Sequence, residues 1–507
     1  MEDEAEQVSI RKAKRQKLNE LDLEAYPLGL KQSNSFSEIR QKYSYLKTDE
    51  KTDDVVAVAG RVMYLRGAGK LSFVSLQDGN NQKLQAMFSL DQVGEEAMKN
   101  FRDLVDIGDY VWVEGKIISS KTGELSVLVK TWKMAAKALR PLPVLHKNLS
   151  DDSRVRRRYL DLLVNDETRN MVFLRSKVVA GLRDGFAKRD FLEIETPMLQ
   201  TLHGGAAARP FVTKMNAFDI DLYLRIAPEL FLKRAVVGGI DRVFEINRNF
   251  RNEGVDSSHS PEFSMLEAYQ TYSDYSDIAM LTKKLIQEVC QSAFGSKIVK
   301  LANEEEYDFS DYAENDFGWD KISLYDSLSA EIGQEINPET PLDKLIIIAK
   351  EKLGESEKKR LTNSEEMKKL LPGKLVELLW EQLVCPKLHK PTFVFDFPED
   401  TSPLVSAHRQ KKGLVEKWDL YIRGFELATG YSELTDPVIQ KERLIQQSHQ
   451  ANIGDDEAMQ MDKDFIEALE YGMPPTAGMG MGIDRLLMAY TGLGLRDTIT
   501  FPLVKPN

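Results

Sequence analysis

Long apolar runs are absent from this 507-residue sequence: no segment approaches the roughly 18 apolar residues that a membrane-spanning helix needs. The start MEDEAEQVSIRKAKRQK also lacks the apolar segment of a secretory signal, so we expect a cytoplasmic protein with no membrane partner. Cys290 and Cys385 lie far apart with no Cys-x-x-Cys pattern. Their placement argues against a disulfide framework or a zinc site and favours two buried thiols.

Size and charge leave a wide range of partners open. A chain of this length with 42% hydrophobic residues can bury a sizeable core, and its length suggests two or three domains. The net charge is −12, with the acidic surplus after residue 150. A net acidic protein still binds nucleic acid through a local basic patch. The basic segment RKAKRQKLNELDLEAYP predicts a helix that ends before Pro27, although a solvated face is its simpler interpretation.

Five short β-branched or alternating segments begin at Val55: VVAVAGRV, LSFVSLQ, KLQAMF, YVWVEGKII and LSVLV. Between the third and fourth, DQVGEEAMKNFRDLV has the apolar spacing of a helix. Five strands with a helix in that gap is the order of an OB barrel, a fold that commonly binds single-stranded nucleic acid or oligosaccharide. The sequence therefore predicts a helical extension over 1–50 and an OB-fold domain over 51–145.

A second domain is expected over 146–507, after the proline-containing linker ALRPLP. The segment RNMVFLRSKVVAGLRDGFAKRDF predicts a helix, and LEIETPML predicts a strand closed by Pro197. Strand-like sequence returns in KWDLYIRGFELATGYSEL. A helix-rich, charged stretch at about 276–385 has the composition of a surface insertion. The fold class is α+β, with the barrel first.

The segment FRNEGVDSSHSPEF, residues 250–263, gathers several ligand-binding groups between two strand-like flanks. Arg251 offers a planar fork for a phosphate or carboxylate, Glu253 an acceptor and His259 a donor. Phe263 offers a face on which a base can stack. Each residue alone is more simply explained as part of a polar loop. Together they are the groups needed to hold ATP.

The glycine-rich segment GMGMGIDRLLM does not read as a dinucleotide loop, because no strand precedes it in EYGMPPTA. Its glycines more plausibly allow a ligand to approach the backbone, and Arg485 follows at the start of an apolar helix. Asp419 and Glu426 lie seven positions apart in strand-like sequence, where they can share a Mg²⁺ ion. From the residues alone, surface carboxylates remain the simpler interpretation of that pair. Glu229 and Glu433 fall in mostly apolar surroundings, where carboxylates need partners.

These motifs, in this order, resemble class II aminoacyl-tRNA synthetases. FLEIETP is similar to motif 1 of that class, FRNEG with HSPEF and EAY to motif 2, and GMGMGIDRLLM to motif 3. A preceding OB barrel marks the subclass for lysine, aspartate or asparagine. GGAAARPF, LRIAPEL, HSPEFSMLEAY and GYSELTD resemble bacterial-type lysyl-tRNA synthetases in particular. The resemblance implies an antiparallel catalytic sheet flanked by helices, and an enzyme that activates L-lysine with ATP and transfers it to the 3′-terminal adenosine of tRNA(Lys).

The resemblance also implies roles for individual residues. The ATP contacts would be Arg251, Glu253, His259, Phe263 and Arg485, of which Arg251 and Arg485 would be catalytic, and Asp419 and Glu426 would bind Mg²⁺. The lysine contacts would be Gly205, Glu229, Arg251, Glu267, Tyr269, Thr429, Tyr431 and Glu433. The anticodon contacts in the barrel would be Arg61, Phe73, Gln85 and Glu124. A homodimer would form through Pro197 and the preceding helix.

Two positions depart from the family pattern, and two other functions stay open. Many members carry Asn where this chain has Thr429, and Phe where it has Tyr431; the shorter Thr429 loses one substrate hydrogen bond or passes it to water. One alternative is a nucleic-acid-binding protein with an inactive synthetase-like scaffold, and another is a lysyl-transferase with a non-tRNA acceptor. The barrel argues against relatives that lysylate a translation factor, and the missing apolar spans argue against lipid-lysylating relatives.

Overall fold

The computed structural model describes residues 2–143, 149–256, 259–355, 361, 370–452 and 459–506. Two compact units, Met1–Asn170 and Met171–Asn507, make up the chain, and each is described by itself. Among the described residues, no helix is both long and apolar enough to span a bilayer.

The first unit contains a closed five-stranded barrel in the order β1-β2-β3-β5-β4, with helices α3 and α4 between β3 and β4. This arrangement confirms the predicted OB fold. Burial alternates along β2, so Val74 and Leu76 lie in the barrel core while Phe73 lies on the outer face. The elements are α1 (Glu2–Glu20), α2 (Phe36–Lys42), β1 (Lys51–Ala68), β2 (Leu71–Gln77), β3 (Lys83–Ser89), α3 (Leu90–Val93), α4 (Glu95–Leu104), β4 (Tyr110–Ser119), β5 (Leu125–Ala136), α5 (Asp151–Arg156) and α6 (Arg158–Val164).

The second unit is built on an eight-stranded sheet in the order β14-β15-β16-β17-β18-β11-β10-β6. Neighbouring strands are antiparallel except at the two edges, where β14 pairs with β15 and β6 with β10 in parallel. The predicted antiparallel sheet is therefore confirmed. Its strands are β6 (Leu192–Glu193), β10 (Arg242–Phe250), β11 (Glu262–Thr271), β14 (Asp320–Ser323), β15 (Thr392–Pro398), β16 (Leu414–Ile422), β17 (Phe425–Ser432) and β18 (Thr476–Gly482); smaller sheets contain β7 (Leu199–Gln200), β8 (Val212–Met215), β9 (Ile220–Leu224), β12 (Ile298–Lys300) and β13 (Glu306–Asp308).

One face of this sheet is covered by α7 (Asp166–Ala187), α9 (Tyr275–Phe294) and α17 (Ile483–Thr491), which together form the main core. Helix α9 buries Ile278, Leu285, Ile286 and Val289 there, with apolar residues at helical spacing. The stretch predicted as a surface insertion over 276–385 thus begins with a helix of the main core. Residues 356–360 and 362–369 of that stretch lie outside the described residues.

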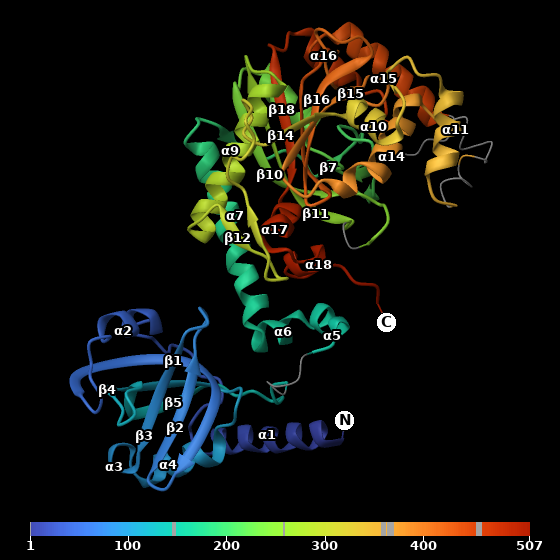
Figure 1. Cartoon of the computed structure of the whole chain (residues 1–507). Helices are drawn as coiled ribbons and strands as arrows, with labels where there is room; N and C mark the ends of the chain where they lie inside the picture. The colour runs from blue at the N-terminus through green and yellow to red at the C-terminus, as the bar shows by residue number, and fades with distance from the viewer. Residues whose placement is uncertain are drawn as a thin grey trace. The chain divides into compact units, whose positions relative to one another are not determined.

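Helices of the opposite side belong to two smaller clusters. One joins α10, α11 and α14 to β15 and β16, and the other joins α8 to α16. Figure 1 shows α9 on one side of the sheet and α10 and α14 on the other. The remaining helices are α8 (Glu229–Val237), α10 (Leu324–Ile332), α11 (Leu342–Lys352), α14 (Pro372–Leu383), η1 (Cys385–Lys387), α15 (Pro437–Asn452), α16 (Lys463–Glu470) and α18 (Leu495–Thr498).

Candidate active site

A cavity of about 520 Å³ lies on the sheet face opposite α9. Its floor consists of alternate residues of neighbouring strands, because side chains at every second strand position share a face. The strand register places Gly478 between Tyr269 and Tyr431, and Gly480 between Glu267 and Thr429. The cavity brings together most of the residues predicted to bind ATP, lysine or metal: Gly205, Glu229, Arg251, Glu253, His259, Phe263, Glu267, Tyr269, Asp419, Glu426, Thr429, Tyr431 and Arg485.

The glycine-rich segment forms strand β18, and its alternation gives the strand two different faces. Both methionines of GMGMG are buried in the main core, while the glycines point to the cavity side. A Cβ atom at Gly478 would lie 2.1 Å from Glu433 Oε1 and 2.6 Å from the Tyr269 ring, and one at Gly480 would lie 2.5 Å from Met265 Cε. A side chain at Gly478 would overlap the Tyr269 ring, so glycine is needed there, and the row of glycines leaves a trough between β11 and β17.

Two arginines approach the cavity from different elements. Arg251 follows β10, and its backbone N–H donates to Pro261 O at 2.9 Å, which closes the hairpin predicted to hold ATP. Burial, with repulsion from Arg485, lowers the pKa of Arg251 despite attraction from nearby carboxylates. Arg485 lies in the first turn of α17 and donates to Glu426 O at 2.8 Å. Two like charges held so close favour an anion between them.

The adenine-binding prediction rests on residues of the same hairpin. The Arg251 guanidinium carbon lies 5.1 Å from the centre of the Phe263 ring, so the cation already covers part of that ring. Glu253 and His259 are more exposed, and His259 Nδ1 lies 2.9 Å from Asp256 Oδ2. Residues 257–258 of the hairpin lie outside the described residues.

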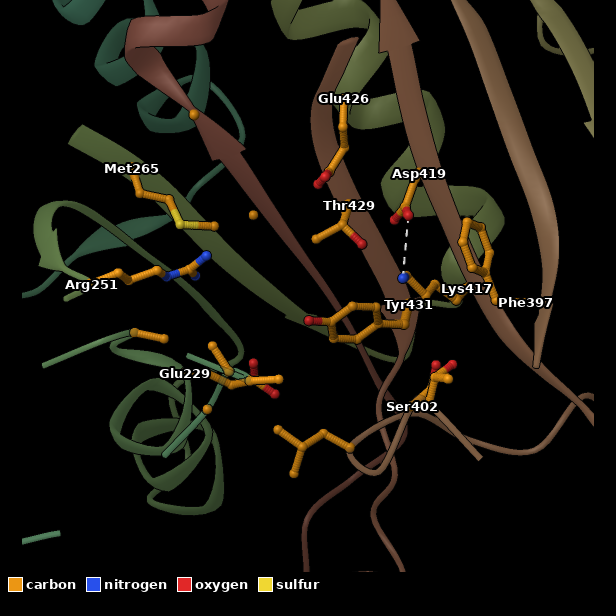
Figure 2. Close-up of a pocket in the computed structure, with 18 of the residues that line it drawn as sticks. Glu229, Arg251, Met265, Phe397, Ser402, Lys417, Asp419, Glu426, Thr429 and Tyr431 are labelled. Atoms are coloured by element: carbon orange, nitrogen blue, oxygen red, sulfur yellow. Dashed lines mark ion pairs between the residues drawn. The ribbon is translucent and has the colours of Figure 1, made fainter. Parts of the chain in front are cut away.

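Carboxylates dominate the opposite end of the cavity. Glu229 begins α8 and is 3% exposed, and Glu267 on β11 is 4% exposed. Burial and repulsion from Glu229 raise the pKa of Glu267 well above its ordinary value, although Arg251 lowers it. The Tyr269 hydroxyl donates to Glu267 Oε2 at 3.3 Å. Figure 2 shows Glu229 and Arg251 on one wall and Tyr431 and Thr429 on the facing strand.

Glu433 is the predicted lysine contact that the cavity lining does not include. Its carboxylate is buried behind the floor, and Glu433 Oε2 lies 2.5 Å from the Nζ atom of Lys233. Lys233 is one turn after Glu229 on α8, and its Nζ atom is also 2.6 Å from Glu229 Oε1. Lys233 was missed in the sequence, where the spacing of Glu229 and Lys233 is that of an ordinary pair on a helix surface.

The predicted metal ligands occupy β16 and β17. Asp419 is buried and pairs with Lys417 at 3.2 Å through Oδ2, as Figure 2 shows, whereas the Glu426 side chain is 43% exposed. Burial and repulsion from Glu426 raise the pKa of Asp419 to about 6, although attraction from Lys417 lowers it. Asp419 Oδ1 is buried and accepts no hydrogen bond within the described part of the chain. Among the same residues, no three His, Cys, Asp or Glu side chains are grouped closely enough to hold a metal alone.

Two lining residues near the metal ligands were also missed in the sequence. Lys417 lies under the Phe397 ring, with Nζ 4.1 Å from the ring centre. Glu381 comes from α14, within the stretch interpreted as an insertion, and burial with repulsion from Glu377 raises its pKa to about 7. The alternation of Lys417 with Asp419 on one strand was a signal for the first residue. No sequence pattern distinguished Glu381 from the other charged residues of the stretch interpreted as an insertion.

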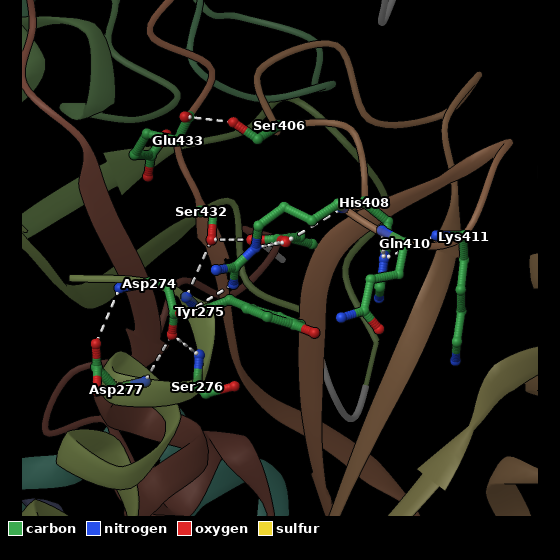
Figure 3. A network of polar contacts seen from close by, with 12 residues as sticks. Asp274, Tyr275, Ser276, Asp277, Ser406, His408, Gln410, Lys411, Ser432 and Glu433 are labelled. Atoms are coloured by element: carbon green, nitrogen blue, oxygen red, sulfur yellow. Dashed lines mark hydrogen bonds and ion pairs between the residues drawn. The ribbon is translucent and has the colours of Figure 1, made fainter.

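A polar network supports the end of β17 from outside the cavity (Figure 3). Ser432 donates to Glu416 Oε2 at 2.6 Å, and Ser406 donates to the backbone carbonyl of Glu433 at 2.7 Å. Arg409 joins Glu416 to Asp274, the N-cap of α9, and its Nη2 atom lies 2.7 Å from Asp274 Oδ2. Arg409, the first residue of the segment RQKKG, thus anchors the end of β17 beside Tyr431 and Glu433.

In the barrel, the predicted anticodon contacts divide into two groups. Phe73 and Gln85 lie on one outer face of adjacent strands, and Gln85 donates to Ser126 at 2.8 Å, close to Glu124. Arg61 lies further along β1, where it donates to Gly108 O at 2.8 Å. Its guanidinium carbon is 4.3 Å from the Tyr110 ring centre. Arg66, an exposed residue missed in the sequence, lies directly opposite Phe73.

The eight-stranded sheet, the hairpin with Arg251 and the strand–helix unit with Arg485 define a class II aminoacyl-tRNA synthetase. A family model described as tRNA synthetases class II (D, K and N) matches residues 150–505, and one described as an OB-fold nucleic acid binding domain matches residues 56–135. The chain belongs to this class II (D, K and N) family.

Two curated lysine–tRNA ligases are similar to this chain over almost their whole length. A lysine–tRNA ligase of Kineococcus radiotolerans is 58% identical over 506 residues, which cover 100% of this chain and 98% of that protein. A lysine–tRNA ligase of Mycobacterium bovis is 53% identical with the same coverage. A lysylphosphatidylglycerol biosynthesis bifunctional protein of Mycobacterium avium is 42% identical, but the match covers only 41% of its length.

Proposed function

We propose that the protein is a lysine–tRNA ligase, which activates L-lysine with ATP and transfers it to the 3′-terminal adenosine of tRNA(Lys). The full-length similarity to lysine–tRNA ligases supports this function. The observation that carries it is the composition of the cavity, with neighbouring guanidinium groups at one end and buried carboxylates at the other. A substrate with one carboxylate and two ammonium groups matches both ends.

The first half-reaction needs no protein nucleophile. A carboxylate oxygen of lysine attacks the α-phosphorus of ATP, and the bond from that phosphorus to the bridging oxygen of pyrophosphate breaks. Arg251 holds the attacking carboxylate and the α-phosphate, and Arg485 holds the outer phosphates with His259. These residues act by orienting the reactants and neutralising charge that develops on phosphate oxygens.

The nucleotide is held by residues of the hairpin. Phe263 stacks on adenine and Glu253 accepts from its amino group, which accounts for the aromatic and the carboxylate in one loop. Mg²⁺ fits Asp419 and Glu426, because this ion is commonly bound by one or two carboxylates together with substrate phosphates. The unpaired Oδ1 atom of buried Asp419 supports that assignment. When bound, Mg²⁺ supplies positive charge to the phosphates.

Lysine is held at the carboxylate end. Glu229 and the carbonyl of Gly205 take the α-ammonium, while Tyr269 and Glu433 take the ε-ammonium. Gly205 has φ +86°, and a Cβ atom there would lie 3.0 Å from Glu229 Cβ, so glycine keeps this wall open. Thr429 and Tyr431 complete the lining.

In the second half-reaction, a hydroxyl of the terminal adenosine attacks the activated carbonyl and AMP leaves. The barrel binds the anticodon of tRNA(Lys), with Phe73 stacking on one base and Gln85, Glu124 and an arginine beside it. A homodimer and a cytoplasmic location remain predictions. The exposure of Leu192, Met198 and Leu199 around Pro197 supports an apolar contact between two copies.

The test of this function is lysine-dependent exchange of pyrophosphate into ATP without tRNA, followed by charging of tRNA(Lys). We expect exchange with L-lysine and none with aspartate or asparagine, the other substrates of the family. Exchange that requires aspartate or asparagine would refute lysine selection. Absence of exchange with all three would favour the inactive scaffold.

A further inference from the structure

Lys233 is a completely buried cation for which the function above has no use. It comes from α8, beneath the floor of the cavity, and its side chain is 0% exposed. Its ammonium contacts Glu229 Oε1 at 2.6 Å and Glu433 Oε2 at 2.5 Å. Glu229 and Glu433 are far apart in the sequence and are the two carboxylates proposed to hold the ammonium groups of lysine.

Each carboxylate uses only one oxygen on Lys233. Both carboxylate oxygens of Glu433 are buried without a hydrogen bond from the described residues; Oε2 is held by the ion pair with Lys233, and Oε1 has no such pair there. It faces the row of the floor in which Gly478 lies, and the ring of Tyr269 is beside it. An oxygen in this environment is costly unless a donor reaches it. The trio of two carboxylates and one lysine carries one net negative charge, which matches the net positive charge of L-lysine.

We infer that Lys233 is a positioning residue for amino-acid selection, which locks Glu229 and Glu433 in the orientation that receives the two ammonium groups of lysine. This inference rests on the proposed function. The ammonium of Lys233 holds Oε1 of Glu229 and Oε2 of Glu433. The other oxygen of each carboxylate is left for the substrate. Without the shared cation, two buried carboxylates would repel each other and turn apart or take up a proton.

The charge on each member of the trio depends on the other two. Burial disfavours the charge on Lys233, but attraction from Glu229 and Glu433 outweighs it and raises the pKa of Lys233. Burial and repulsion from Glu229 raise the pKa of Glu433 to about 8, although attraction from Lys233 lowers it. Lys233 therefore opposes protonation of the carboxylate that must be charged to bind an ammonium.

The test compares Lys233→Met with a matched control, Lys283→Met, in the full-length protein. Lys283 is also a buried helical lysine of the second unit, paired with Asp311 at 2.9 Å, but it does not line or support the cavity. In pyrophosphate exchange, Lys233→Met is expected to raise the KM for lysine at least about tenfold. The KM for ATP should change by less than about twofold, and preference for lysine over norleucine should fall. Lys283→Met should keep the parental values.

A double variant distinguishes positioning from general support of the fold. If Lys233 acts through Glu433, the loss in Lys233→Met with Glu433→Gln should be close to the larger single loss, because coupled residues are not additive. Full additivity would overturn the inference, as would an unchanged or lower KM for lysine in Lys233→Met. A parental protein without lysine-dependent exchange would refute the proposed function instead.

If Lys233→Met does not fold, Lys233→Arg is measured in its place. The guanidinium keeps the charge but holds the carboxylates at a different spacing. The KM for lysine is then expected to rise severalfold, with preference over norleucine retained. An unchanged KM for lysine in that variant would overturn the inference.

Discussion

The two ends of the cavity solve the problem of binding charge in different ways. At the amino-acid end, Glu229, Lys233 and Glu433 are each at most 4% exposed in their side chains and pair within the protein. At the nucleotide end, the side chains of His259 and Glu426 are 53% and 43% exposed, and two arginines of the same sign lie near each other. The first end is buried and internally paired, and the second is more exposed to solvent and holds two arginines directed at the proposed phosphate positions.

Because of this difference, the amino-acid end and the nucleotide end should affect different properties of the reaction. A buried carboxylate oxygen without a donor is costly, so a substrate side chain without the second ammonium leaves Glu433 Oε1 without a donor. At the more exposed end, water screens each contact and no single exposed residue decides which ligand binds. Changes at Glu433 should therefore alter which amino acid is used, whereas changes at the nucleotide end should alter how fast any amino acid reacts.

The largest effect is expected from Arg251→Ala, at the point where the two ends meet. Removing this guanidinium takes away a contact to both the α-phosphate and the lysine carboxylate, so exchange should fall by at least about 100-fold. Pyrophosphate exchange with L-lysine measures the loss. The matched control is Arg248→Ala, three residues earlier in the chain, because Arg248 pairs with Glu262 at 3.7 Å and does not line the cavity. If Arg251→Ala exchanges pyrophosphate at near the parental rate, Arg251 does not hold the α-phosphate.

Glu433→Gln should have the next largest effect, confined to the amino-acid end. The substitution keeps shape and removes charge, and truncating a buried ion pair typically costs about 2 to 5 kcal/mol, of which each 1.4 is about tenfold. We therefore expect a loss of at least about tenfold in kcat/KM for lysine with little change in the KM for ATP.

Exchange with lysine, ornithine and norleucine provides the readout for this variant. Glu229→Gln is its comparison, because that change loosens the α-ammonium, which every amino acid carries, and should leave side-chain discrimination unaltered. A Glu433→Gln protein that still prefers lysine over norleucine as strongly as the parent would show that the ε-ammonium is recognised elsewhere.

Phe73→Ala tests whether both ends of the cavity are independent of the barrel. Stacking on an aromatic is worth about 1 to 3 kcal/mol per base, so tRNA charging should weaken while exchange without tRNA stays nearly unchanged. Tyr45→Ala, which removes an aromatic that is 67% exposed outside the barrel strands, is the control. Equal losses in both assays would mean that Phe73 supports the fold. The outer-face position of Phe73 argues against that outcome.

Arg66 refines the same experiment. Because it lies opposite Phe73, Arg66→Ala is expected to weaken charging more than Arg61→Ala. Arg61 is held by Gly108 O and the Tyr110 ring, so its guanidinium is already engaged within the barrel. If Arg61→Ala loses more charging than Arg66→Ala, Arg61 is the anticodon contact, as predicted from the sequence.

The sequence was most informative where a function depends on residues that are close in the chain. The ATP hairpin, the strand–helix unit with Arg485 and the five-stranded barrel all have short-range patterns, and the structure contains each of them. Lys233 could not be found in this way, because its pairing with Glu433 joins residues about 200 positions apart. The core position of α9 was hidden for a related reason. Its buried residues fall within a charged stretch, and only the sheet that they cover shows which side faces inward.

The smallest effect is expected from Arg409→Gln, which reaches the amino-acid end from outside. Arg409 is 63% exposed in its side chain, and its pairs with Asp274 and Glu416 support Ser432 next to Glu433. Exposed ion pairs are worth about 0 to 1 kcal/mol, so the KM for lysine should rise by no more than about fivefold, with the KM for ATP unchanged. Lys412→Gln removes an exposed charge from the same loop and should leave both constants at parental values. A rise in the KM for ATP alone would mean that this network supports the nucleotide end. The network beside β17 would then not belong to the amino-acid end.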